Sequence, residues 1–285
     1  MVAQLRKNEL IINDGNFHRF IGDSDVLGGN FGKRGLVPAD LATCPVASMK
    51  GASPFDLSFK VIEDTTQIID MCKEITNSQA RLSDNRRRYV SGSPIPSLDQ
   101  NGQGFCWNYS VTMTVMMTRM KMRLPYVRLS GHANACMIKN FRDEGGWCGL
   151  SMERQTSHGS PSIEFWAEKS MSRSNDNPKT WENAALHKVS EGWVDLRSPV
   201  YDRNMTFKQV LTLLLCGIPV AADYNWWGHS VCLLDVVLVE NGSLGVRGIN
   251  SWTDGWGNLG EFVLQGDKAV PDSAVAPRTI YASAA

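Results

Sequence analysis

The chain has 285 residues, of which 42% are hydrophobic and 20% are charged, as in a soluble globular protein long enough to bury a large core. Its 29 Lys and Arg residues equal its 29 Asp and Glu residues, so no nucleic-acid partner held by bulk electrostatics is expected. The longest apolar run, residues 210–220, is interrupted by Gly217 and Pro219, so no membrane span and no membrane partner are expected.

The cysteines and the N-terminal segment bear on the cellular compartment. Seven cysteines, an odd number, occur in a chain whose first residues lack the apolar stretch of a secretory signal, which favours free thiols in a reducing cytoplasm. Cys136 and Cys148 lie twelve residues apart without further ligands at short spacing. They are therefore predicted to be structural, with no metal site and no cofactor.

Residues 1–90 are predicted to form a loop-rich N-terminal extension. They are rich in glycine, proline and turn residues, and short apolar pieces such as residues 10–12 predict one or two short strands within residues 1–60. Apolar residues recur at helical spacing only over about 62–80, which predicts one amphipathic helix. The basic run at 86–88 is predicted to lie in a solvated loop. The Ser-Gly-Ser-Pro segment that begins at Ser91 is typical of a linker, so we place a domain boundary near residue 90.

The pattern becomes helical after this linker. Residues 107–123 are predominantly apolar and contain no glycine or proline, which predicts a buried central helix that Pro125 ends. Its methionines are predicted to fill the core, because thioethers suit irregular packing. Two shorter helices are predicted at 130–140 and 147–157.

Strands dominate the prediction after one further helix. Thr206 and Gln209 match a capping box before a helix over 210–215, with Gly217 as its C-terminal cap. Runs of β-branched and aliphatic residues between turn signals then predict four strands. These strands are expected at 218–222, 230–240, 245–250 and 261–265. Helices followed by strands within one domain predict an α+β architecture.

Five side chains suggest thiol chemistry. Cys106 precedes the predicted central helix, so its sulfur would lie at the positive end of the helix dipole. His229 would act as its base, in a pair resting largely as thiolate and imidazolium. Asn250 would orient the imidazole, with Asp223 as an alternative orienting group. The Cys106 amide and the Gln100 side chain would supply the donors for an oxyanion.

The segments that carry these residues resemble the active-site motifs of papain-like cysteine peptidases. They are QNGQGFCW at 100–107, GHSVCLL at 228–234 and NSWTDGWGNLGEF at 250–262. The paired glycines Gly145 and Gly146, followed by Trp147, resemble the segment whose backbone pairs with a bound peptide in that family. The resemblance covers about residues 95–285, and the chain as a whole is similar to papain-like proteins of tailed bacteriophages.

This resemblance implies a two-lobe papain-like fold for residues 91–285. A helical lobe over about 100–195 would precede an antiparallel, β-barrel-like lobe over about 196–285. The resemblance also implies a substrate pocket lined by Trp147, Cys148, Trp227 and Ser230. The bulk of Trp227 would make that pocket shallow or block it. Trp252, also expected at the substrate site, would shield the bond between the histidine and the asparagine from water.

Two positions depart from the family pattern together. The cysteine expected three residues before the nucleophile is Gln103, and its expected disulfide partner is Asp143. Losing both ends of one disulfide agrees with a reducing compartment.

Two main functions remain in competition. The first is a cysteine peptidase that cleaves peptide or protein substrates through a thioester. The second is a structural bacteriophage virion protein, decorating or joining a particle, whose residues 1–90 contact other virion proteins and which is incorporated in the virion. A peptidoglycan amidase is a third option that fits Asn250 less well, because such thiol enzymes usually pair the cysteine with two histidines.

Overall fold

The computed structural model describes residues 5–21, 34–55, 60–239 and 242–280. Eight strands in this part of the chain form one sheet in the order β1-β7-β6-β5-β4-β8-β3-β2. In chain order they are β1 (Ile11–Ile12), β2 (Ala52–Pro54), β3 (Val189–Asp195), β4 (Val220–Tyr224), β5 (His229–Leu238), β6 (Leu244–Ile249), β7 (Glu261–Gln265) and β8 (Ser273–Ile280).

The sheet is mixed, whereas the sequence predicted an antiparallel, barrel-like lobe. The six inner strands are antiparallel to their neighbours, but β1 pairs parallel with β7 and β2 pairs parallel with β3. Because β1 and β2 occupy the two edges, the sheet stays open. Both edge strands come from residues 1–90, so this segment, expected as an extension, contributes to the same sheet.

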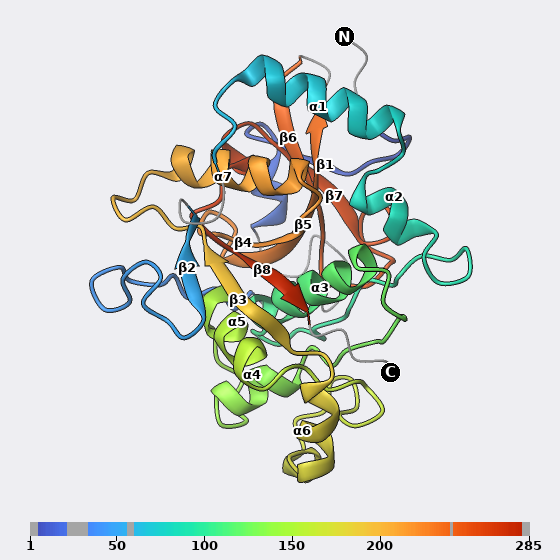
Figure 1. Ribbon diagram of the computed structural model, residues 1–285, viewed down its shortest axis with the longest axis vertical. Coiled ribbons are helices and arrows are strands. Elements are labelled where there is room, and N and C mark those ends of the chain that lie inside the picture. The colour runs from blue at the N-terminus through green and yellow to red at the C-terminus, as the bar shows by residue number, and fades with distance from the viewer. Residues whose placement is uncertain (1–4, 22–33, 56–59, 240–241, 281–285) are drawn as a thin grey trace.

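The described residues also form seven α-helices (Figure 1). They are α1 (Thr65–Asn77), α2 (Leu82–Arg87), α3 (Cys106–Lys121), α4 (Ala133–Ile138), α5 (Cys148–Ser157), α6 (Pro178–Ala185) and α7 (Arg203–Leu215). In Figure 1, α1 and α7 lie together at one end of the view and α4, α5 and α6 at the other. The helical portion thus precedes most of the sheet, and the α+β architecture is confirmed.

Alternate residues of the central strands face two separate cores. On β5, Val231 and Leu233 pack in the cluster that contains α7, while Cys232 and Leu234 pack in the cluster that contains α3. This is the two-residue period of a strand that is covered on both faces. The sheet therefore holds α3 and its first residue against β5, where the candidate base begins the strand.

Helix α3 is buried from Cys106 to Met120, and its three threonine hydroxyls are satisfied within the helix. Thr112, Thr114 and Thr118 each donate a hydroxyl hydrogen bond to the carbonyl four residues earlier, at 2.8–2.9 Å. Buried hydroxyls without partners would be costly. The predicted central helix is confirmed, and its methionines lie in the core.

Three local expectations were wrong. Helix α7 begins at Arg203, because Asp202 rather than Thr206 caps it by accepting from the Asn204 and Met205 amides. The sequence patterns did not reveal α6, β3 or β8. Arg86, expected in a solvated loop, lies in α2 and is completely buried.

Candidate active site

The three candidate catalytic residues lie at the ends of regular elements. Cys106 is the first residue of α3, His229 is the first residue of β5, and Asn250 directly follows β6. Strands β5 and β6 are antiparallel neighbours, so the start of β5 and the end of β6, and with them the histidine and the asparagine, lie at the same end of the strand pair. All three side chains are completely buried.

His229 and Asn250 are held together as the sequence predicted. The Nε2 atom of His229 lies 2.8 Å from Oδ1 of Asn250, which can accept a proton shared from the ring. The indole of Trp252 stacks on the imidazole with ring centroids 4.7 Å apart, and so covers this bond. The other ring nitrogen, Nδ1, is buried and has no hydrogen-bond partner. Nδ1 is therefore the ring nitrogen that is available to accept the proton of a thiol.

The Cys106 sulfur accepts a hydrogen bond from the backbone amide of Gly35 at 3.3 Å. Burial raises the pKa of the Cys106 thiol to about 11, although hydrogen bonds from Gly35 and Ser230 oppose the shift. Burial also lowers the pKa of His229 to about 4; its bond to Asn250 opposes this, and the nearby charge of Arg34 adds to it. Both shifts favour the neutral thiol and the neutral imidazole in this closed site, rather than the expected thiolate–imidazolium pair.

Residues 34–38, here called the strap, occupy the groove over the sulfur. Leu36 pairs parallel with Gly146: the Val37 amide donates to the Gly146 carbonyl and the Gly146 amide to the Gly35 carbonyl, each at 2.9 Å. On the opposite side the Leu36 amide donates to the Gly228 carbonyl at 3.2 Å. The paired-glycine segment thus binds a peptide backbone through Gly146, as its resemblance implies, and that peptide belongs to the same chain.

Gln100 lies beside the asparagine motif through two contacts. Its Oε1 accepts from the Ser251 hydroxyl at 2.6 Å, and its backbone amide donates to the Ser251 carbonyl at 3.0 Å. Its side-chain amide donates to the Gln103 carbonyl at 2.7 Å. As the first residue of α3, Cys106 has an amide that no helical carbonyl can satisfy. One predicted oxyanion donor, Gln100, thus lies in the loop before α3, and the other, the Cys106 amide, lies at the first residue of the helix.

The predicted substrate-pocket residues separate into two groups. The Trp227 ring is completely buried and belongs to an aromatic cluster beside His229, where it also contacts Trp226 and Trp252. It has no exposed surface for a substrate, which agrees with a blocked pocket rather than a shallow one. Trp147 instead packs in the core around α3, with the Arg197 guanidinium over its ring.

Asp223 has a position that sequence reasoning missed. It was considered as an alternative partner for His229, but its carboxylate accepts from the hydroxyls of Ser230 and Ser273 and from the thiol of Cys148. Strand alternation explains this, because Asp223 lies opposite Ser230 in the β4–β5 ladder and Tyr224 lies opposite His229. Asp223 therefore holds Cys148, Ser230 and Ser273 in place through hydrogen bonds, and Asn250 remains the partner of His229.

The missing disulfide is replaced by a hydrogen bond. The backbone amide of Gly104 donates to the Asp143 carboxylate at 2.7 Å, and this contact joins the same two segments that the family disulfide would join. All seven cysteines are free. Among the described residues, no group of three or more His, Cys, Asp or Glu side chains is arranged to hold a metal ion.

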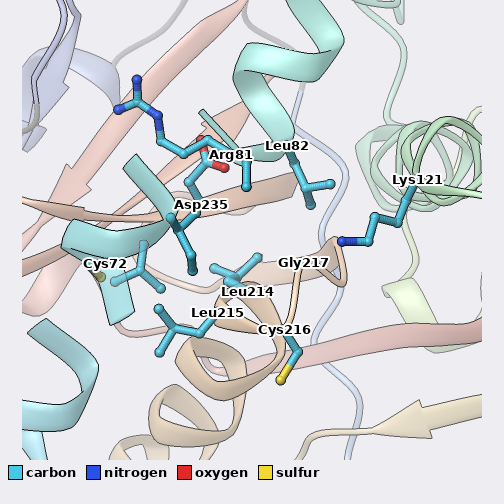
Figure 2. Close-up of a pocket in the computed structure, with 12 residues that line it drawn as sticks. Cys72, Arg81, Leu82, Lys121, Leu214, Leu215, Cys216, Gly217 and Asp235 are labelled. Carbon is cyan, nitrogen blue, oxygen red and sulfur yellow. The ribbon is translucent and has the colours of Figure 1, made fainter. Parts of the chain in front are cut away.

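A separate pocket of about 90 Å³ lies away from these residues (Figure 2). It is lined by the end of α7, by Cys72 of α1, Leu82 of α2 and Lys121 of α3, and by Asp235 of β5. None of the candidate catalytic residues lines it. No helix in the described parts of the chain is long and apolar enough to cross a membrane.

Solved structures share this architecture at low sequence identity. Xylellain, a cysteine protease from Xylella fastidiosa, is similar with a TM-score of 0.56 and 14% identity, over 86% of this chain and 96% of that chain. For a recombinant stem bromelain precursor the TM-score is 0.55 and the identity 15%, over 78% of this chain and 76% of that one.

Digestive procathepsin L 3 from the larval midgut of Tenebrio molitor has a TM-score of 0.52 and 18% identity over 64% of this chain. This chain spans 66% of that protein's length. No protein-family model and no curated protein matches the sequence. The structural likeness shows that the chain has the papain-like α+β fold of these cysteine proteases.

Proposed function

We propose that this chain, built on a papain-like fold, is a cysteine peptidase that uses Cys106 as its nucleophile. The observation that carries the proposal is the bond between His229 and Asn250, which leaves the buried Nδ1 free for a thiol proton at the start of α3. A lone buried cysteine is usually structural, but here the thiol forms hydrogen bonds with Ser230, the residue that follows the candidate base, and that base is held by its orienting amide.

The reaction would proceed in two steps. His229 takes the thiol proton, the sulfur attacks a peptide carbonyl, and the resulting oxyanion accepts hydrogen bonds from the Cys106 amide and from Gln100. The C–N bond breaks, and the imidazolium returns the proton to the leaving amine. His229 then removes a proton from water, which hydrolyses the thioester and restores the thiol.

The first prediction compares alkylation rates. Iodoacetamide should label Cys106 at a rate that falls at least about tenfold in His229→Ala, because a thiol without its base loses nucleophilicity. Mass spectrometry of each cysteine measures the rate, with exposed Cys216 as internal reference. The groove must open before Cys106 is labelled in either protein. The ratio of the two Cys106 labelling rates therefore reports how far His229 activates the thiol. Equal Cys106 rates would refute the proposed nucleophile.

A structural role in a bacteriophage particle is the second candidate. It is favoured by the closed groove, because the strap covers the candidate nucleophile. Contacts with other virion proteins would then use the free sides of the edge strands β1 and β2, since unpaired strand edges bind further strands. Purified particles that contain the chain at a fixed copy number, together with an unreactive Cys106, would support this role. A cytoplasmic location fits both candidates.

A further inference from the structure

We propose that the strap is a permanent latch, which closes the site over Cys106 and is lifted to open it while both of its ends stay attached to the sheet. This inference rests on the proposed function, because it concerns access to the same thiol. It differs from a removable leader segment in that activation requires movement of residues 34–38 and not their loss.

The strap closes the groove by bonding to both of its sides. Its backbone reaches Gly146 on the helical side and Gly228 beside the base, and its Gly35 amide contacts the sulfur between them. The Arg34 side chain adds a hydrogen bond to the Trp227 carbonyl at 3.3 Å. Together these contacts leave Cys106 with no exposed surface.

The strap is bound in an unreactive orientation. The sulfur lies on the N–H side of the peptide between Arg34 and Gly35, and in a planar trans peptide the carbonyl oxygen points the opposite way. Attack requires the sulfur over the carbonyl carbon, with the oxygen directed at the oxyanion donors. The next carbonyl, that of Gly35, is already bound to the Gly146 amide. The strap therefore blocks the thiol without serving as its substrate.

Both flanks of the strap are built into the fold. Upstream, β1 pairs with β7, and Glu9 forms a buried ion pair with Arg247 of β6. Downstream, β2 pairs with β3 through three residue pairs. Removing the N-terminal residues would take an edge strand out of the sheet. A tethered segment also rebinds at a high effective concentration, so lifting of the strap opens the groove reversibly and keeps both edge strands in the sheet.

Gly35 fits a space that no other residue can occupy. A Cβ atom there would lie 1.9 Å from the Gly104 carbonyl oxygen, which belongs to the loop preceding Cys106. The next part of the strap is more loosely held. Val37 is 55% exposed, and Pro38 and Ala39 line an open hollow of about 150 Å³ with Tyr201. The strap thus has a tight contact at the sulfur and free space beside its far end.

The experiment measures Cys106 alkylation by iodoacetamide in strap variants of the full chain. Val37→Pro removes the amide that binds the Gly146 carbonyl, and we expect a roughly five- to tenfold faster rate, the effect of one backbone hydrogen bond. Val37→Ala is the matched control, because it keeps the amide and removes only an exposed side chain. Gly35→Ala should accelerate labelling at least as much, whereas Gly15→Ala, in an open loop, should not.

The outcomes distinguish the latch from the proposed function. Cys106 rates in Val37→Pro and Gly35→Ala that equal the native rate overturn the latch, even if His229 controls the native rate. If a strap variant is labelled faster than the native chain, and at the same rate when His229→Ala is added to it, that result supports the latch but overturns the activated nucleophile. The completely buried thiol of Cys232 serves as a folding control, since it is labelled only if a variant unfolds.

Discussion

Gln100 shows how one side chain can be tied to one chemical step. Its carbonyl oxygen is held by Ser251, which fixes the amide end of the side chain near the start of α3. An oxyanion forms during acyl transfer, but it does not form when a thiol displaces iodide from iodoacetamide. The amide of Gln100 should therefore matter for peptide cleavage and be unimportant for alkylation.

The second prediction follows from this difference. Gln100→Ala should lower the rate of peptide hydrolysis about 10²- to 10³-fold, the usual effect of losing one oxyanion donor, and should leave Cys106 alkylation within about twofold. Ser251→Ala is the control, because it removes the contact but keeps the amide donor. Both rates are measured in the native chain and in Val37→Pro. A parallel loss of hydrolysis and alkylation would show that Gln100 supports the thiol itself.

Arg6, α2 and β7 are joined by a single carboxylate. Glu261, at the start of β7, is completely buried and pairs with Arg6, with Arg86 at 2.8 Å and with Arg87 at 2.7 Å. Three cations around one buried anion balance its desolvation, whereas the arginines alone would repel one another. This cluster is why Arg86 and Arg87 do not lie in a solvated loop, whereas Arg88, which follows α2, is exposed.

A third prediction concerns this cluster. Glu261→Gln should lower the free energy of unfolding by about 3–5 kcal/mol, because it leaves the buried Arg86 with only a longer, 3.3 Å pair to the partly exposed Asp254. The matched substitution Asp70→Asn removes an exposed pair with Lys73 and should change stability by less than about 1 kcal/mol. Urea unfolding of both variants measures the difference. Equal effects would mean that the buried cluster contributes no more than a surface pair.

At the scale of the whole molecule, buried histidines link stability to pH. His132, His187 and His229 are buried, and burial lowers the pKa of each to about 4. The unfolded chain binds these protons near pH 6.5, before the folded chain does. Their stabilising contribution is therefore complete above pH 6.5 and is lost as the pH falls towards 4. Burial raises the pKa of Asp223. This one carboxyl group therefore adds stability as the pH falls, which opposes the effect of the three histidines.

The fourth prediction is acid lability. The free energy of unfolding should fall between pH 6.5 and 4 by roughly 1.4 kcal/mol per pH unit for each histidine that stays neutral in the fold. Urea midpoints at pH 7.5, 6 and 5 test this directly. Replacing His187 by Gln, which can keep a polar contact with the Ser160 carbonyl, should weaken the dependence. A midpoint that stays constant over this range would contradict the prediction.

Local patterns determined much of this protein. The apolar run after Cys106 specified α3. A helix satisfies its own backbone hydrogen-bonding groups, and the threonine hydroxyls of α3 bond to carbonyls of the same helix, so the run can be buried. The alternation and turn signals after Ile218 specified β4 to β7, and the order of cysteine, histidine and asparagine motifs indicated the papain-like fold and the pairing of His229 with Asn250. Each of these signals is contained within a short segment.

What only the tertiary structure decided depends on contacts between distant segments. No local pattern shows that residues 34–38 lie over Cys106, that Asp143 binds Gly104, or that Glu261 neutralises Arg86. Edge strands of two or three residues are too short to carry a period, so β1 and β2 were not predictable as parts of the sheet. The tertiary structure also shifted the pKa values of Cys106 and His229, because burial is a property of the assembled fold.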